Sequence, residues 1–397
     1  MNAPMNRPLD GITVLSLEQA VAAPFATRQL ADLGGRVIKV ERPGVGDFAR
    51  AYDTRVRGEA SYFIWANRSK ESLTLDVKHP KAQRILSQLL AKADVFVQNL
   101  APGAASRLGL SAKALRSRYR RLVVCDVSGY GNTGPYCRKK AYDLLIQAEA
   151  GLLSVTGTPD QVVRAGISVA DIAGGMYAYS AILAALIQRG RTGEGSHIEV
   201  SLLEALAEWM GSPLYYAFEG QPQAARTAAS HPSIYPYGPF ETADGKTVIF
   251  GLQNEREWWV FCSEVLRRAD LAADSRFESN AARSTNREEL RKLIDGSFRS
   301  LTAQQLVARL DEFSIGNASV SSIVDVWAHP QLKARDRWTQ VDSPVGSIPA
   351  LKPPAIFDTF DYRMDSVPML GQHNSDILLE LGYSTGEIEQ FRAENVI

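Results

Sequence analysis

The stretch Ile12-Thr13-Val14-Leu15-Ser16-Leu17 opens the pattern that decides the fold of this 397-residue chain. It is a short apolar run of the kind that forms a buried strand. Similar runs recur at residues 36–41, 73–77, 95–99 and 122–128. Segments with apolar residues at helical spacing lie between them, at residues 25–33 and 81–92. Strands that alternate with helices predict a doubly wound, Rossmann-like α/β domain around a parallel sheet, in which ligands bind beyond the carboxyl ends of the strands.

The pattern changes further along the chain. Residues 172–188 place apolar side chains on one face of a long helix, and a strand and a second helix follow to about residue 210. From residue 221 a proline-rich linker leads to a predicted strand and three helical segments, at residues 247–251, 255–268, 286–299 and 302–313. Strand and loop patterns return after residue 330, and a helix at 385–394 ends the chain. We therefore expect a large α/β domain over residues 1–220, a smaller α+β domain over 221–330, and a C-terminal segment over 331–397.

The composition is that of an ordinary globular protein, with 45% hydrophobic and 22% charged residues. Lys and Arg together number 44, as do Asp and Glu, so the zero net charge argues against nucleic acid or a charged membrane surface as a partner. The three cysteines are too far apart for a zinc site or a disulfide framework, and no H-E-x-x-H motif suggests another metal site. Without an apolar signal segment or an apolar run of about 18 residues, we expect a cytoplasmic protein without a membrane partner.

The segment Gly44-Val45-Gly46-Asp47-Phe48-Ala49 matches the G-x-G-x-x-A pattern of dinucleotide-binding proteins. That motif must follow the first strand and open its helix, because its glycines admit the pyrophosphate there. In this chain the first strand continues into residues 19–24, which contain no glycine, and the match follows the second strand. A nicotinamide-dependent oxidoreductase is therefore disfavoured.

Asp171 is the strongest candidate for a reactive group. It stands in Ile167-Ser168-Val169-Ala170-Asp171-Ile172-Ala173-Gly174-Gly175-Met176, at the start of the predicted long helix. Ser168 and Asp171 have the spacing of a capping box, so the carboxylate has a purely structural interpretation. The same position suits a nucleophile, since a carboxylate at a helix start stays ionised and attacks an acyl carbon. Gly174 and Gly175 would let a backbone or a ligand approach closely. Both interpretations stay open at this point.

Charged residues near the expected strand ends and helix starts form a second candidate group. Arg42, Lys78 and Arg107 are each ordinary surface charges when considered singly. Together, at the ligand-binding edge of a parallel sheet, they would suit a ligand with several phosphates. Asp143 begins another helical run, and a solvated first turn is its structural interpretation.

The ordered motifs of the whole chain resemble the family III CoA-transferases, which include transferases acting on oxalate and carnitine and the α-methylacyl-CoA racemases. The resemblance is carried by these segments: residues 8–15, residues 31–41, Asn99-Leu100-Ala101-Pro102-Gly103, Ser128-Gly129-Tyr130-Gly131 with Gly134-Pro135, the Asp171 helix with Arg191-Thr192-Gly193, Leu370-Gly371-Gln372-His373-Asn374, and residues 380–384. It implies a large α/β domain formed by both ends of the chain, a smaller domain, and two chains interlocked like linked rings in a homodimer.

The resemblance also implies the chemistry. Asp171 matches the aspartate that forms an acyl anhydride and then a CoA thioester, with CoA and acyl-CoA as substrates and no permanently bound cofactor. Arg42, Lys78, Asn99, Arg107 and Lys140 match positions that contact CoA. Tyr62 and Tyr142 match positions that line the acyl site, where Asp143 and Val21 are also expected. Val21 stands where the oxalate enzymes carry glutamine, so oxalate is not the expected substrate.

The residues 16–24 resemble the branch that acts on C4–C5 dicarboxylic acyl groups, such as succinyl, itaconyl, mesaconyl and citramalyl. A second carboxylate needs a cation, for which Arg50, Arg164, Arg226 and His231 are candidates. A racemase is an alternative, but it needs a histidine where this chain has Tyr142. A non-catalytic acyl-CoA-binding protein on the same scaffold is the other alternative.

Overall fold

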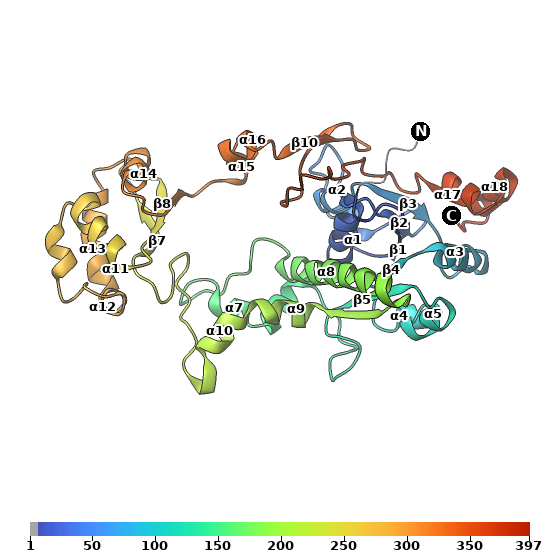
Figure 1. Ribbon diagram of the computed structural model, residues 1–397, viewed down its shortest axis with the longest axis horizontal. Coiled ribbons are helices and arrows are strands. Elements are labelled where there is room, and N and C mark those ends of the chain that lie inside the picture. The colour runs from blue at the N-terminus through green and yellow to red at the C-terminus, as the bar shows by residue number, and fades with distance from the viewer. Residues whose placement is uncertain (1–6) are drawn as a thin grey trace. The chain divides into compact units, whose positions relative to one another are not determined.

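The computed structural model of the chain describes residues 7–397, which form two compact units (Figure 1). The first unit contains the described residues up to Leu152 together with Ala165–Ser212 and Ala334–Ile397. The second contains Leu153–Arg164 and Pro213–Lys333. The chain thus leaves the first unit twice. The breaks after Ser212 and after Lys333 lie close to the expected boundaries at residues 220 and 330, whereas the short segment 153–164, expected in the large domain, belongs with the second unit.

The first unit is built on a six-stranded sheet whose order is β3-β2-β1-β4-β5-β6, and all neighbouring strands are parallel. The strands are β1 (Thr13–Leu17), β2 (Arg36–Glu41), β3 (Lys70–Thr74), β4 (Val95–Gln98), β5 (Val123–Ser128) and β6 (His197–Ser201). Val14 lies opposite both Val37 and Val95, so apolar side chains meet in the middle of the sheet. This architecture confirms the predicted parallel α/β domain. The order of the strands reverses between β1 and β4, and such a switch point is where α/β sheets bind ligands.

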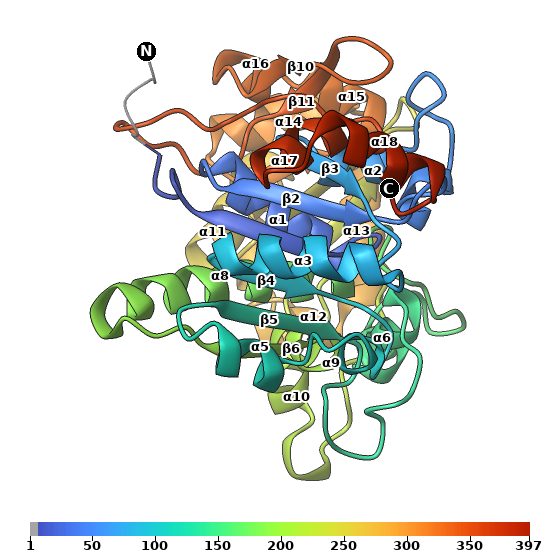
Figure 2. The ribbon, with the colours of Figure 1, turned by 90° about the vertical axis from the view of Figure 1, so that its right-hand side faces the viewer.

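Helices cover both faces of this sheet. α1 (Ala22–Asp32) and α8 (Val169–Thr192) pack on the face that carries Val14, Val97 and Val123. The opposite face is covered by α3 (Pro80–Lys92), α5 (Ala112–Arg118), α17 (Asn374–Glu380) and α18 (Thr385–Ala393), as Figure 2 shows. The remaining helices and strands of the first unit are η1 (Phe48–Ala51), α2 (Ser61–Ala66), α4 (Ala104–Arg107), α6 (Asp143–Glu149), α9 (Leu202–Trp209), and the hairpin of β10 (Trp338–Val341) with β11 (Ile348–Leu351).

β3 begins and ends three residues before the strand expected at 73–77. The shift arises because its inward side chains are polar: Ser72 donates to Glu41 at 2.6 Å, and Thr74 contacts Asn374. The apolar run at residues 73–77 therefore coincides only with the end of β3. The free edge of β3 is covered by the C-terminal segment, where Ser72 N donates to His373 Nδ1 and Thr74 N to Asn374 Oδ1. The motif at residues 370–374 thus protects a sheet edge that would otherwise pair with other chains.

α8 is long and apolar enough, by length and composition alone, to cross a membrane, and no other helix among residues 7–397 meets that measure. Its inner face carries Ala170, Ala178, Ile182 and Ala185, which are buried with α1 and the sheet. It therefore packs as a core helix.

The second unit is a small α+β assembly. Its antiparallel sheet has the order β7-β8-β9, with β7 (Tyr237–Glu241), β8 (Thr247–Gly251) and β9 (Asn317–Ser319). Its core is aromatic, with Phe250, Trp258, Phe261 and Phe298 all fully buried. Its helices are η2 (Phe218–Gly220), α11 (Glu255–Val260), η3 (Phe261–Val265), η4 (Ala269–Ala273), α12 (Asn280–Thr285), α13 (Arg287–Phe298), α14 (Ala303–Glu312) and α15 (Ile323–Trp327). Helices α7 (Leu152–Val155), α10 (Gly211–Tyr216) and α16 (Pro330–Ala334) lie at the boundaries of the units.

Candidate active site

The candidate site is built around Asp171, in the first turn of α8. β6 runs parallel to its neighbours, so the helix that precedes it must begin at the edge where the strands end. Two glycines seat this turn: a Cβ on Gly174 would lie 2.4 Å from the Leu202 side chain, and one on Gly175 would lie 2.7 Å from the carbonyl oxygen of Ala22. The glycine pair thus lets the neighbouring helices approach closely. From the sequence we expected close approach of either a backbone or a ligand, and the structure shows a backbone, that of Ala22. Asp171 is thereby fixed beside the start of α1.

The N-terminus of α8 is capped by a residue from another helix. The Ser168 side chain makes no capping bond. Instead, Asp143 Oδ1 accepts from the backbone N–H of Ala170 at 2.8 Å and of Asp171 at 3.4 Å. Asp143 Oδ2 accepts from the buried Gln147 side chain at 2.7 Å. The capping-box interpretation of Ser168 and Asp171 is therefore wrong, and the cap comes from a carboxylate 28 residues earlier in the chain.

This arrangement leaves the Asp171 carboxylate without a partner. Within residues 7–397 it accepts no hydrogen bond and forms no ion pair, although it is partly buried. Burial, and then the negative charge of Asp143, raise its pKa to about 7. A carboxylate that neither caps a helix nor pairs with a cation costs stability, which is typical of catalytic groups.

Three tyrosines lie near Asp171. The Tyr62 hydroxyl is 3.5 Å from Ser168 Oγ, at the start of α8. The Tyr52 ring meets the edge of the Tyr62 ring, with centroids 5.6 Å apart. Burial, and the nearby charges of Asp47 and Asp171, raise the pKa of Tyr52 to about 12, so its hydroxyl stays protonated. Tyr142 precedes α6 and is 65% exposed, free to meet a ligand. The sequence analysis did not predict Tyr52 as a site residue, because it follows the segment 44–49, whose pattern pointed to a dinucleotide.

The start of α1 offers backbone donors beside Asp171. Val21 stands at its N-cap position without a side-chain capping bond, and the first turn carries no acidic residue. The first N–H groups of a helix have no partner within the helix, and they carry partial positive charge. Such donors stabilise an oxyanion. Val21 itself is buried.

Four of the five predicted CoA contacts are exposed cations near the ends of the strands. Arg42 directly follows β2, Lys78 follows β3, Arg107 ends α4 after β4, and Lys140 follows β5. Within the described chain none of these four side chains forms an ion pair, in contrast to Lys39, which is fully buried against Asp47. Cations left unpaired at a ligand-binding edge suit phosphate groups.

Asn99 has a different place from the other predicted CoA contacts. Its side-chain oxygen accepts from Gln19 N at 2.8 Å, and its side-chain nitrogen donates to Gln19 O at 2.9 Å. Both polar atoms of the amide therefore hold the loop between β1 and α1. A direct contact between Asn99 and CoA stays a prediction.

Comparison with known proteins identifies the family of the chain. The family model for CoA-transferase family III matches residues 9–374. The chain belongs to this family. Succinyl-CoA:glutarate CoA-transferase of Mus musculus is 36% identical to this CoA-transferase over 98% of its length and 90% of the relative's. Succinate–glutarate CoA-transferase of Agrobacterium fabrum is 34% identical over 94% and 96% of the two chains. Other matching relatives are named for D-citramalate and mesaconate.

The fold of the CoA-transferase agrees with a solved relative. A crystal structure of a CAIB/BAIF family protein from Brucella suis superposes with a TM-score of 0.84 at 34% identity, covering 95% of this chain and 100% of that one. The predicted family, the α/β fold and the enzymatic class are therefore confirmed. The dinucleotide motif has a structural explanation in this enzyme, since a Cβ on Gly46 would lie 2.9 Å from Glu41 Oε2.

The cations suggested for a second carboxylate are mostly engaged in this CoA-transferase. Arg50 forms a two-pronged ion pair with the buried Glu41, at 2.8 and 2.9 Å. Arg226 donates to two backbone carbonyls of the second unit, and His231 accepts from Ser233 N and Ile234 N. Arg164 lies in the segment of the second unit that precedes α8. Arg50 therefore holds a loop, and it is not available as the second-carboxylate cation.

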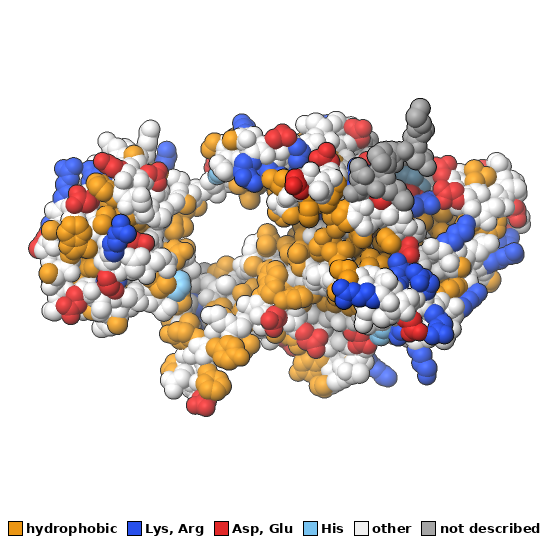
Figure 3. Space-filling view, viewed as in Figure 1, with side chains coloured by type: hydrophobic (Ala, Val, Ile, Leu, Met, Phe, Trp, Pro, Cys, Tyr) orange, Lys and Arg blue, Asp and Glu red, His pale blue; other side chains and the backbone are white. Residues whose placement is uncertain are grey.

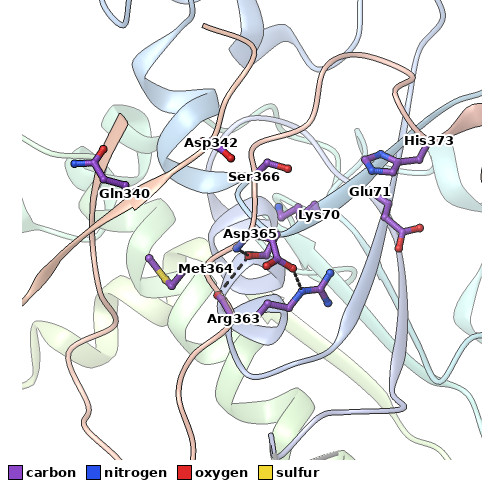
Figure 4. Close-up of a pocket in the computed structure, with 10 residues that line it drawn as sticks. Lys70, Glu71, Gln340, Asp342, Arg363, Met364, Asp365, Ser366 and His373 are labelled. Atoms are coloured by element: carbon purple, nitrogen blue, oxygen red, sulfur yellow. Dashed lines mark hydrogen bonds and ion pairs between the residues drawn. The ribbon is translucent and has the colours of Figure 1, made fainter. Parts of the chain in front are cut away.

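A polar cavity of about 720 Å³ lies elsewhere on the first unit, between the start of β3 and the C-terminal segment (Figure 4). Its wall includes Lys70, Asp342, Arg363, Asp365 and His373, and Arg363 pairs with Asp365 at 2.6 Å. None of the residues predicted to bind CoA or the acyl group lines it. The cavity is distinct from the residues around Asp171.

Proposed function

We propose that this CoA-transferase moves CoA between C4–C5 dicarboxylic acids through covalent intermediates on Asp171. The observation that carries the proposal is the unpartnered carboxylate of Asp171, with its pKa raised to about 7, at the start of a core helix. The relatives named for glutarate, citramalate and mesaconate support the substrate class. The reaction exchanges one activated acyl group for another and requires no other energy source.

In the first step a carboxylate oxygen of Asp171 attacks the thioester carbon of the donor. The carbon–sulfur bond breaks, so a mixed anhydride forms and CoA leaves as a thiolate. The thiolate then attacks the carboxyl carbon of Asp171, which releases the donor acid and leaves an aspartyl-CoA thioester. The acceptor carboxylate attacks this thioester, forming a second anhydride and CoA thiolate. Attack of the thiolate on the acceptor acyl carbon yields the new acyl-CoA and regenerates Asp171.

The surrounding residues support these steps in distinct ways. Partial burial keeps water from competing with the thiolate for the anhydride. Backbone N–H groups at the start of α1 stabilise the oxyanion of each tetrahedral intermediate. Arg42, Lys78, Arg107 and Lys140 hold the phosphates of CoA, and Tyr62 and Tyr142 line the acyl group.

We further propose that two chains form an interlocked homodimer. The proposal is supported by large apolar side chains that the single chain leaves exposed, shown in Figure 3 over α8 and α10. Ile187 on α8 is 62% exposed, and Leu214 and Tyr215 on α10 are 62% and 79% exposed. Exposed apolar patches of this kind mark protein interfaces. Light scattering after gel filtration tests the proposal, and a stable monomer at micromolar concentration would contradict it.

The function is tested by incubating the enzyme with succinyl-CoA and isotopically labelled glutarate, mesaconate or citramalate, and measuring new acyl-CoA by mass spectrometry. We expect at least one labelled acyl-CoA, and a loss of about 1,000-fold or more in the Asp171→Asn variant, as for removal of other covalent nucleophiles. CoA binding without transfer, unaffected by the substitution, would favour the non-catalytic alternative.

The racemase alternative predicts a reaction that a separate assay detects. The five histidines have partners away from Asp171: His79 accepts from Lys81 N, His197 bonds Asp126, His231 accepts from Ser233 N, His329 accepts from Gln331 N, and His373 accepts from Ser72 N. A racemase would exchange the α-proton of a 2-methylacyl-CoA in deuterated water. We expect no such exchange.

A further inference from the structure

Asp47 is a fully buried carboxylate outside the groups that the proposed reaction uses. It stands at the N-cap of η1, where Oδ1 accepts from Ala49 N at 2.9 Å. Its Oδ2 accepts from the buried Lys39 ammonium at 2.7 Å. Its own backbone N–H donates to Glu41 Oε2 at 3.0 Å. A carboxylate with this many partners is held in one orientation.

The same carboxylate also reaches the loop between β1 and α1. Ala20 N donates to Asp47 Oδ1 at 2.9 Å and to Oδ2 at 3.1 Å. Ala20 has φ +60°, a left-handed conformation that is unfavourable for a residue with a Cβ. The neighbouring Gln19 is fixed on both backbone groups by Asn99. Asp47 thus supplies the acceptor that holds the next peptide in its strained conformation, directly before the N-terminus of α1.

The segment that Asp47 caps leads to the aromatic wall of the site. Tyr52 directly follows η1, its ring contacts Tyr62, and Asp171 is among the charges that raise its pKa. A second bond joins the two loops here, since Phe48 N donates to Gln19 Oε1 at 3.1 Å. Asp47 therefore lies where the loop that leads into α1 meets the loop that carries Tyr52.

The far C-terminal segment braces this junction from outside. Glu41, which accepts from Asp47 N, also accepts from Arg50 and from Ser72 Oγ. Ser72 Oγ in turn accepts from Gly371 N at 2.9 Å, and Arg50 donates to the carbonyl of Pro368. The junction is thereby tied to segments some 300 residues apart in the chain, which makes it a rigid support.

We propose that Asp47 is a positioning residue for the transfer reaction: it aligns the backbone donors at the start of α1 and the Tyr52 ring with Asp171. The proposal rests on the proposed function, because it assumes that Asp171 is acylated. Misplacing donors by about 1 Å costs up to roughly 100-fold in rate without a matching loss of binding. Of the four cations proposed to hold the phosphates, Lys78, Arg107 and Lys140 lie on other segments and only Arg42 shares a loop with Asp47, so CoA affinity should depend little on Asp47.

The test compares Asp47→Asn with Asp94→Asn. Asparagine has one acceptor oxygen, so it cannot accept both from Lys39 and from the N–H groups of Ala20 and Ala49, and its NH2 group faces one of these donors. Asp94 holds the other end of β1 in an analogous way, accepting from Thr13 N at 2.8 Å and pairing with Arg189 at 2.9 Å. For each protein we would measure the rate of Asp171 acylation by succinyl-CoA, kcat, KM for succinyl-CoA, and Tm. We expect Asp47→Asn to lower the acylation rate and kcat by 10-fold or more with KM changed less than about 3-fold, while Asp94→Asn keeps kcat within 2-fold.

Equal changes in kcat for the two variants, or full kcat in Asp47→Asn, would overturn the proposal. If Asp47→Asn does not fold, Asp47→Ser replaces it, because serine can still cap η1 but is too short to reach Ala20 and Lys39 as well. We expect the same loss of kcat, and unchanged kcat in a folded Asp47→Ser protein would equally overturn the proposal. Wild-type enzyme that neither transfers CoA nor becomes acylated would instead refute the proposed function.

Discussion

Replacement of Asp143 by asparagine separates the two effects that this residue has on Asp171. The pKa of Asp171 is about 7 against an ordinary 3.8, with burial as the larger cause and the charge of Asp143 as the smaller. Asparagine keeps the oxygen that accepts from Ala170 N, so α8 stays capped. Removing the charge should therefore undo less than half of the rise and lower the pKa of Asp171 to about 6.

The lower pKa favours the ionised nucleophile in mild acid. At pH 6 the ionised fraction of Asp171 should grow from about one tenth to about one half, a gain of roughly 5-fold, with little change at pH 8. The assay is the rate of Asp171 acylation by succinyl-CoA between pH 5 and 9. Glu149→Gln is the control, because Glu149 is an acid on the same helix that pairs with Lys139 instead. An acid limb that stays in place or moves to higher pH in Asp143→Asn would refute the reasoning.

Three further outcomes are expected. Asp171→Asn should raise the free energy of unfolding by about 1–3 kcal/mol at pH 8. Ionised Asp171 destabilises the folded protein increasingly as pH rises from about 4 to 7, because its pKa is raised in the folded state. The increase in the free energy of unfolding of the variant, measured by urea denaturation, should therefore grow over that pH range and stay constant above it. An equal increase at pH 4 and pH 8 would be contrary evidence. Gly175→Ala should destabilise the protein by about 2–3 kcal/mol and slow transfer, because the added Cβ would meet the carbonyl oxygen of Ala22. Gly190→Ala should stabilise α8 by up to about 1 kcal/mol, because a Cβ there has no neighbouring atom within 4 Å. Thermal melts that show Gly175→Ala to be the more stable of the two variants would contradict this packing. Lys78→Ala should raise KM for succinyl-CoA by about 10-fold with kcat little changed. Arg118→Ala, at the opposite edge of the sheet, should leave KM unchanged. Steady-state kinetics measures both, and the effect of Lys78→Ala should be smaller at the higher of two salt concentrations because salt screens the charge.

The sheet and the position of Asp171 were predictable because their causes are local. Apolar runs with helices between them identify the strands, and β2 has the expected bounds of Arg36–Glu41. The long helix was also expected, although α8 begins earlier, at Val169. The start of β3 was not predictable from an apolar run, since its side chains are polar: Lys70 and Ser72 reach Glu18 and Glu41 across the sheet, and Thr74 accepts from Asn374 of α17.

The support of the site could not be predicted, because its bonds join residues far apart in the sequence. The spacing of Ser168 and Asp171 suggests a capping box, yet the acceptor that caps α8 comes from Asp143. Asn99 matches a CoA contact by position, but its amide holds Gln19. Asp47 lies inside a motif that points to a dinucleotide, and only the fold reveals its bonds to Ala20 and Lys39.

The central claim is that Asp171 carries the acyl group, and one measurement tests it most directly. The enzyme would be incubated with succinyl-CoA, trapped with hydroxylamine, digested and analysed by mass spectrometry. We predict a hydroxamate on the peptide that contains Asp171, formed at a rate that matches turnover and absent from Asp171→Asn. Transfer of CoA by the wild-type enzyme with that peptide unmodified, or with the hydroxamate on another residue, would contradict the account.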